Sequence, residues 1–89
     1  MNKLFKALAD PTRRAILDSL RAKDLSASEI AEQFSISKPS ISHHLSLLND
    51  AELVLRERKG QKIIYSLNAT VFQQVIEWLY NLKGERNEH

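Results

Sequence analysis

With 89 residues, 43% of them apolar and 27% charged, the chain is long enough for one globular domain, and its composition excludes a fibrous or disordered chain. The formal net charge of +2 is a mild basic bias, so the placement of the charges says more than their total. Because the sequence has no cysteine, disulfides, thiolate metal sites and thiol-based redox switches are excluded.

Helical periodicity and capping signals predict four helices in the first half of the chain, over residues 2–9, 11–21, 27–34 and 38–50. Asp10 caps the second helix, and Pro11 takes its first position, where a missing N–H costs little. Ser26 and Glu29 form a capping box at the start of the third helix. Ser37 caps the fourth after a short connection, so the third and fourth helices predict a helix-turn-helix.

A change of period after the fourth helix predicts a β-hairpin with strands over 53–59 and 62–67 and a turn at Gly60 and Gln61. Alternation along the second strand places Ile63, Tyr65 and Leu67 on its inward face. The resulting order, with a final helix after the hairpin, is ααααββα. That order is the winged helix-turn-helix plan, a mainly α fold with a two-stranded β wing.

The final helix is predicted to begin at a cap, Asn68 or Thr70, and to run to about Leu82, with Gly84 just past its end as a stop signal. We therefore expect one domain over residues 1–84, with dimerisation helices at both ends, and a tail over 85–89. The start of the chain becomes polar too soon for a signal peptide or a spanning helix, so we expect a cytoplasmic protein.

The fourth helix has two different faces. At about 100° per residue, Leu45 and Leu48 lie near Ile41 on a core face, His44 lies at the edge of that face, and His43 points about 200° away. No acid occurs from residue 35 to 48, which suits a surface that meets phosphates. The residues expected to contact a major groove are Ser37, Lys38, Ser40, Ser42 and His43.

The predicted hairpin is basic around its turn. On charge alone, such a run is typical of a solvated hairpin tip. Because it follows a helix that has no acid from residue 35 to 48, it instead indicates a wing that contacts phosphates or an adjacent minor groove. The expected wing residues are Arg56, Arg58, Lys59, Gln61 and Lys62.

Three blocks of the sequence, in order, resemble the ArsR/SmtB family of bacterial repressors: Asp10–Leu17, Ser37–Leu48 and the wing segments Arg58–Gln61 and Tyr65–Leu67. The resemblance spans roughly Phe5 to Leu82. It implies a winged-helix transcriptional repressor that binds a palindromic operator in double-stranded DNA as a homodimer. The strings Ile36–Leu45 and Tyr65–Asn68 are most similar to the SdpR-type autorepressor branch. That likeness implies repression of the protein's own operon and a membrane immunity-type protein that sequesters the repressor.

The final helix is apolar on more than one face, and a domain this small can bury only part of that surface. Core packing accounts for some of these residues. The surplus is expected at a two-fold interface with the first helix, as the family resemblance implies. The expected interface residues are Leu4, Phe5, Leu8, Phe72, Val75, Trp78, Leu79 and Leu82.

The metal sensors of the family use a Cys-x-Cys pair on the third helix, where this sequence has Ser26 and Ser28. Serine hydroxyls are poor ligands for soft or borderline metals. The family's other site lies on the last helix, where only Glu77 is a candidate ligand, with His89 in the tail. We therefore expect no metal and no cofactor.

Two other functions are considered. A winged helix that binds only another protein is disfavoured by the basic hairpin and the acid-free fourth helix. A small hydrolase that uses Ser42, His43 or His44 is disfavoured because the histidines point to different faces and no glycine-rich oxyanion loop is present. An enzyme is therefore not expected.

Overall fold

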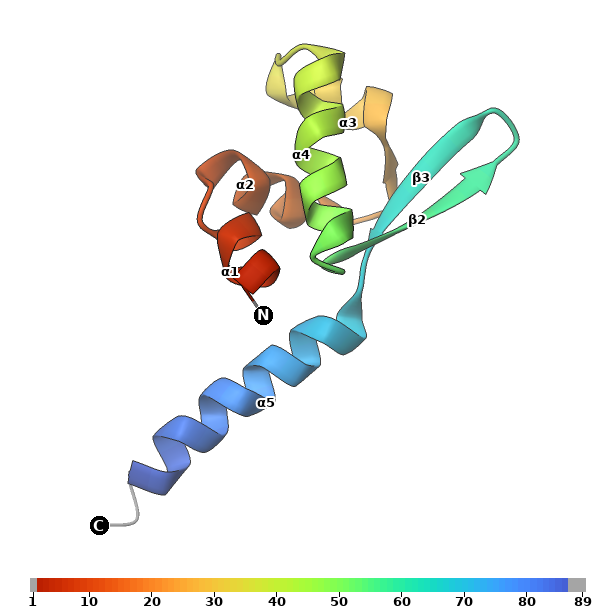
Figure 1. The fold of residues 1–89 in the computed structure, drawn as a ribbon. Helices are drawn as coiled ribbons and strands as arrows, with labels where there is room; N and C mark the ends of the chain where they lie inside the picture. Colours follow the sequence, from red (N-terminus) through yellow and green to blue (C-terminus); the bar gives the residue numbers. More distant parts are fainter. Residues whose placement is uncertain (1, 87–89) are drawn as a thin grey trace.

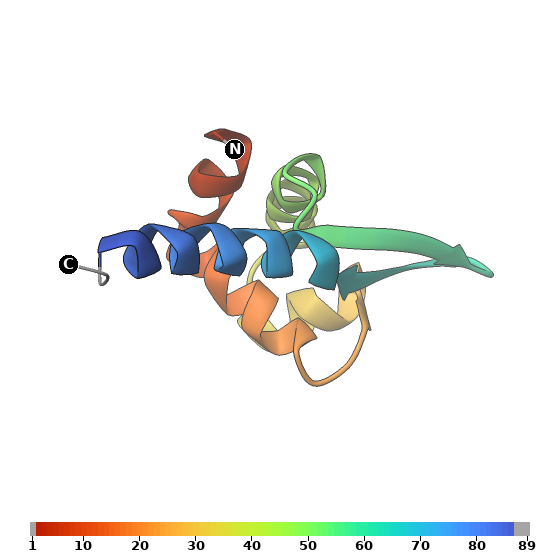
Figure 2. The same cartoon turned by 90° about the horizontal axis from the view of Figure 1, so that it is seen from below.

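The computed structural model describes residues 2–86 and confirms the winged helix-turn-helix fold (Figure 1). Its elements in chain order are α1 (Asn2–Leu8), α2 (Pro11–Leu20), β1 (Leu25–Ser26), α3 (Ala27–Phe34), α4 (Lys38–Asp50), β2 (Val54–Lys59), β3 (Lys62–Leu67) and α5 (Ala69–Arg86). The hairpin and α5 extend from the helical body in different directions, which gives extents of 54 × 24 × 22 Å (Figures 1 and 2).

Local caps set the helix starts where the sequence predicts them. The side chain of Asp10 accepts a hydrogen bond from the Arg13 backbone N–H at 3.0 Å, and this bond holds the pKa of Asp10 below its ordinary value. Ser26 and Glu29 form both bonds of the capping box, at 3.2 and 2.8 Å. Ser35 ends α3 in the left-handed conformation, with φ of 54°, so the chain turns sharply into α4.

The core lies around α4, which packs against α1, α2, α3 and β2. Ile41, Leu45 and Leu48 are fully buried, as the helical rotation predicts. They meet Ile16 of α2 and Ile30 of α3 in a single apolar cluster. Because all of this packing uses one side of α4, its opposite side is left on the surface.

The sheet has one more strand than the sequence predicts. β1 pairs antiparallel with β3, with Leu25 opposite Tyr65, so the order is β1-β3-β2. β2 pairs with β3 across a turn at Gly60, whose φ of 63° suits glycine. β1 therefore ties the start of α3 directly to the base of the hairpin.

Ile63 lies on the same strand face as Tyr65, as predicted, but it is not buried, because 41% of its side chain is exposed. On the same face of the strand, Tyr65 is buried and Leu67 packs against the core. The hairpin continues past the helical body toward its turn (Figure 1), and Ile63 lines an open hollow beside α3 and α4 instead of the closed core. Alternation therefore assigns the correct face of the strand without assigning its burial.

The last helix begins directly after Asn68, one of its two predicted caps, but departs from its predicted C-terminal end. Asn68 precedes it, and its carbonyl accepts from the backbone N–H of Val71 at 3.2 Å, whereas Thr70 lies inside the helix. Gly84 also lies inside α5, which runs on to Arg86, so the predicted stop and the start of the predicted tail at Glu85 are wrong. Glycine ends a helix when it takes a positive φ, and in the described chain only Gly60 does so. The rest of the predicted tail, residues 87–89, lies outside the described residues.

Candidate nucleic-acid interface

The free side of α4 carries the predicted recognition residues. Ser37 caps the helix: its Oγ accepts from the Ser40 backbone N–H at 3.3 Å and donates to the Ser40 Oγ at 3.1 Å. Pro39 in the first turn needs no hydrogen-bond partner for its nitrogen. The predicted recognition residues are all exposed: Ser37, Lys38, Ser40, Ser42 and His43.

The two adjacent histidines have different surroundings. His43 is exposed on the free side of α4, and His44 is half-buried at the edge of the core face. The Nη1 atom of Arg13 lies 3.2 Å from the Nδ1 atom of His44. Because a guanidinium group can only donate, Nδ1 of His44 is the acceptor in this contact. The prediction that His44 packs and holds a hydrogen bond, while His43 projects outward, is confirmed.

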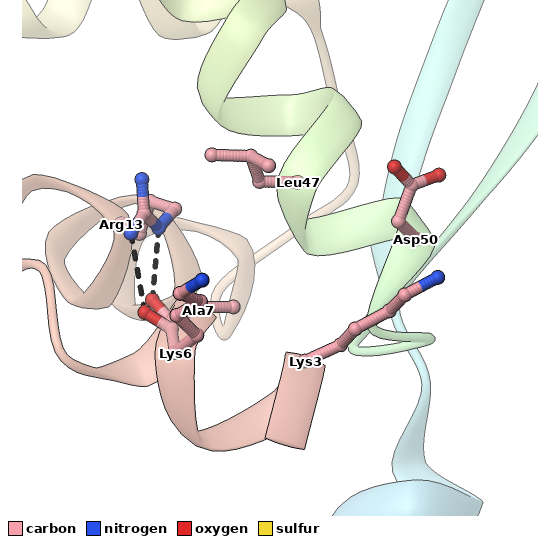
Figure 3. A pocket seen from close by; sticks show the side chains of 6 residues that line it. All are labelled: Lys3, Lys6, Ala7, Arg13, Leu47 and Asp50. Atoms are coloured by element: carbon pink, nitrogen blue, oxygen red, sulfur yellow. Dashed lines mark hydrogen bonds between the residues drawn. The ribbon is translucent and has the colours of Figure 1, made fainter. Parts of the chain in front are cut away.

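Arg13, the residue that holds His44, is not among the residues predicted from the sequence to form the site. It also donates from Nε to the Ala7 carbonyl at 2.9 Å and from Nη2 to the Lys6 carbonyl at 3.2 Å (Figure 3). Arg13 thereby satisfies carbonyls at the end of α1 and connects α1, α2 and α4. It lines a pocket of about 450 Å³ together with Lys3, Lys6, Ala7, Leu47 and Asp50.

The hairpin exposes all of its predicted wing residues. Lys59 pairs with Lys62 next to the turn, and Arg58 pairs with Ile63. Arg58 Nε donates to the Gly60 carbonyl at 3.3 Å. The only acid on the hairpin, Glu57, lies 3.9 Å from the Lys59 ammonium; both groups are well exposed, so the pair is weak. The exposed wing residues are Arg56, Arg58, Lys59, Gln61 and Lys62.

The structure brings some of the predicted recognition residues of α4 together with some of the predicted wing residues of the hairpin. A hollow of about 260 Å³, called here the basic hollow, is lined by Lys38 and Ser42 of α4 and by Gln61 and Lys62 of the hairpin. The start of α3 completes it. The further lining residues are Ser26, Ala27, Ser28, Ile63 and Tyr65. In the described chain, the other predicted DNA contacts lie outside this hollow, on the free side of α4 and along the hairpin.

Ser28 of the basic hollow was missed as a site residue, although Ser26 and Ser28 were noted as replacements for a thiolate pair. The available signal was the capping box, which places both residues at the positive end of α3.

Between residues 2 and 86 the structure shows no cluster of three or more His, Cys, Asp or Glu side chains that could hold a metal ion.

The predicted dimer residues fall into three groups. Leu4 is only 7% exposed and belongs to the core of the protomer, which leaves little of it for a partner. Leu8, Phe72 and Val75 are half-buried against that core. Between 42% and 52% of each remaining side chain is exposed: Phe5, Trp78, Leu79 and Leu82.

Phe5 and Trp78 connect the two terminal helices. Their ring centroids are 6.1 Å apart at an interplanar angle of 51°, a tilted aromatic pair between α1 and α5. The C-terminal half of α5 extends beyond the helical body (Figure 2). No helix in the described range 2–86 is both long enough and apolar enough to cross a membrane.

Comparison with known proteins agrees with this geometry. Residues 10–55 match the model of the bacterial regulatory protein, arsR family. Transcriptional repressor SdpR of Bacillus subtilis (strain 168) is 56% identical, over 98% of this chain and 99% of that protein. An arsenical resistance operon repressor of Staphylococcus aureus is 36% identical, over 86% of this chain and 74% of that protein. The solved structure of an ArsR-like transcriptional regulator from Rhodococcus sp. RHA1 superposes with a TM-score of 0.88 at 30% identity, covering 98% of this chain and 82% of that one.

Proposed function

This chain belongs to the ArsR family of bacterial regulatory proteins and is a transcriptional repressor of that family, and we propose that it binds a palindromic operator in double-stranded DNA as a homodimer. The observation that carries the proposal is the exposed side of α4, which has no acid from Lys38 to Leu48, next to a basic hairpin. As a transcriptional regulator the chain is not an enzyme.

In the proposed complex, α4 enters the major groove with its free side toward the bases. Ser40 and His43 are one helical turn apart, so a hydroxyl and an imidazole reach the same stretch of groove floor. The exposed basic residues of the hairpin then lie over the adjacent backbone or minor groove, where they neutralise phosphates. Base contacts would come from α4, and the hairpin would add affinity that does not depend on sequence.

The proposed homodimer is supported by the apolar side chains that the protomer leaves uncovered. Leu79 and Leu82 are half-exposed on α5, and Trp78 and Phe5 form an exposed aromatic pair beside them. A second copy related by a two-fold axis would cover this surface with the same surface of its own. Two recognition helices would then face half-sites about 34–36 Å apart, or a multiple of that distance.

We propose further that the repressor does not sense metal through the known sites of its family. Ser26 and Ser28 occupy the places of thiolates, and the Ser26 backbone and hydroxyl bond Glu29 instead of a metal. Glu77, the candidate on α5, accepts a hydrogen bond from Gln73 at 3.1 Å. Two serine hydroxyls and one carboxylate do not supply the thiolate, imidazole and carboxylate ligands that hold a tetrahedral zinc site.

Autorepression, a cytoplasmic location and a membrane immunity-type partner belong to the same proposal. They are supported by the likeness to SdpR over nearly the whole chain. The partner would act by sequestering the repressor away from its operator. Deleting a neighbouring gene for a small membrane protein should then increase repression of the shared operon, and unchanged expression would contradict this part of the proposal.

The proposed DNA binding is tested with the full chain and the duplex upstream of its own gene. Fluorescence anisotropy should give an affinity about 10³-fold or more above that for a shuffled duplex of the same length and salt, the usual range for specific readers. Equal affinities for the two duplexes would contradict sequence-specific repression.

A further inference from the structure

The basic hollow is lined by side chains that donate hydrogen bonds. Lys38 and Lys62 supply ammonium groups, Gln61 supplies an amide, and Ser28 and Ser42 supply hydroxyls. None of the described residues that line it is acidic. These donors come from three elements, α3, α4 and the hairpin, so they surround the hollow instead of forming a flat surface.

The first turn of α3 adds to this positive character. Ser26 is the N-cap, so Ala27 and Ser28 are the first two helical residues, whose backbone N–H groups have no partner within a helix. The Ser26 hydroxyl is already used by the N–H of Glu29. The positive end of the helix dipole therefore lies at the hollow beside the two lysines.

Glu29, an acid in the same first turn of α3, is turned toward the capping box. Its Oε1 accepts from the Ser26 backbone N–H at 2.8 Å. That bond is the main cause of a lowered pKa of Glu29, to which the charge of Lys62 also contributes. The single negative charge of Glu29, already used in a hydrogen bond, is outweighed by two lysine charges and the positive end of α3. The electrostatic surroundings of the hollow therefore favour an anion.

We propose that the basic hollow holds one phosphate group of the operator backbone, between Lys38 of α4 and Lys62 of β3. The proposal rests on the proposed DNA binding. A volume of about 260 Å³ accommodates one phosphodiester group, and the mixture of ammonium, amide and hydroxyl donors suits its two free oxygens.

The position of the hollow favours a backbone phosphate over a free ion. Lys38 opens the helix proposed to enter the major groove, and Lys62 opens the second strand of the proposed wing. A phosphate held by both would fix the angle between the hairpin and the recognition helix (Figure 1). Ser28 would bring α3 into the same contact.

The test replaces each operator phosphate in turn by an uncharged methylphosphonate and measures the affinity of the full chain at constant salt. For the wild type, neutralising one phosphate in each half-site should weaken binding about tenfold, as expected for a charge-assisted contact. Lys38→Met and Lys62→Met should each weaken binding to the unmodified operator. In both variants the same methylphosphonate should weaken binding clearly less than tenfold, because one of the two ammonium contacts is already lost.

Lys59→Met is the matched control. Lys59 is exposed on the same hairpin but does not line the hollow. This variant should lose affinity for all duplexes, yet keep the full tenfold sensitivity at the critical phosphate. Circular dichroism of the three variants checks that each remains folded.

Three results would overturn the proposal in distinguishable ways. If the wild type binds the operator but no phosphate position shows a reduced effect in both lysine variants, the proposed phosphate site is contradicted while the proposed DNA binding stands. A second result would assign the hollow to a free ion. In that case no backbone position is sensitive to methylphosphonate, and inorganic phosphate at constant ionic strength weakens operator binding by the wild type but not by the lysine variants. If the wild type does not bind the unmodified operator at all, the proposed DNA binding is contradicted together with the phosphate site.

Discussion

The Nη1 atom of Arg13 on α2 lies 3.2 Å from the Nδ1 atom of His44 on α4. The same guanidinium donates to the carbonyls of Lys6 and Ala7 at the end of α1 (Figure 3). This contact connects three helices on the side of α4 that faces the body. The residue before His44, His43, is exposed on the opposite side of the helix. Adjacent histidines therefore serve different purposes, one in packing and one on the surface.

The His44→Ala variant should lower the free energy of unfolding by about 1–2 kcal/mol, because it leaves a half-buried guanidinium donor without its acceptor. The His43→Ala variant is the matched control and should stay within about 0.5 kcal/mol of the wild type, since its side chain is exposed. Urea unfolding followed by circular dichroism measures both. Equal stability of the two variants would show that the contact with Arg13 contributes nothing.

Trp78→Glu or Leu79→Glu should convert the proposed dimer into a monomer and weaken operator binding. A carboxylate placed on the exposed apolar side of α5 would have to be buried without a partner in the two-fold interface. Gln74→Glu, at an exposed polar position of the same helix, should leave the dimer intact. Sedimentation velocity at micromolar concentration checks this, and a wild-type protein that sediments only as a monomer would contradict the proposed assembly.

Arg58→Ala should weaken binding to every DNA sequence by a similar factor and reduce the slope of log affinity against log salt by about one. The reason is that a phosphate contact releases counterions but reads no base. Arg21→Ala is the control, because Arg21 lies at the end of α2 in an exposed ion pair with Asp18. Salt titrations of binding to the operator and to shuffled DNA measure the slope, and an unchanged slope for Arg58→Ala would remove that residue from the interface.

Zinc, cadmium or copper at low micromolar concentration should leave operator affinity unchanged, because Ser26 and Ser28 are poor ligands for these metals. Magnesium at the same concentration controls for the general effect of a divalent ion. Anisotropy titrations with each metal provide the measurement. Stoichiometric metal binding coupled to release from DNA would refute the proposal that the repressor does not sense metal.

Features that depend on short-range signals could be predicted from the sequence. Ser26 and Glu29, three residues apart, define the start of α3 by themselves, and Ser37 does the same for α4. The rotation of α4 follows from its apolar spacing, so the different surroundings of His43 and His44 follow from the order of the residues alone.

Features that depend on distant parts of the chain could not. β1 has two residues and exists only through its pairing with β3, so it leaves no periodic signal. The rotation of α4 places His44 at an edge but does not say that Arg13 of α2 faces it. Likewise, nothing in the sequence says that Lys38 and Lys62 line one hollow, because the angle of the hairpin depends on tertiary packing.

The affinity of the Ser40→Ala and His43→Ala variants for the operator tests the proposed recognition side of α4 most directly. Each substitution removes an exposed polar group without touching the core, so the melting temperature should stay at the wild-type value. Gln74→Ala on α5 is the control. Fluorescence anisotropy should show each α4 variant weakened by about 1–3 kcal/mol, roughly 5- to 150-fold, if the lost group contacts a base edge. Wild-type affinity for both variants, with normal folding, would show that this side of α4 does not read the operator.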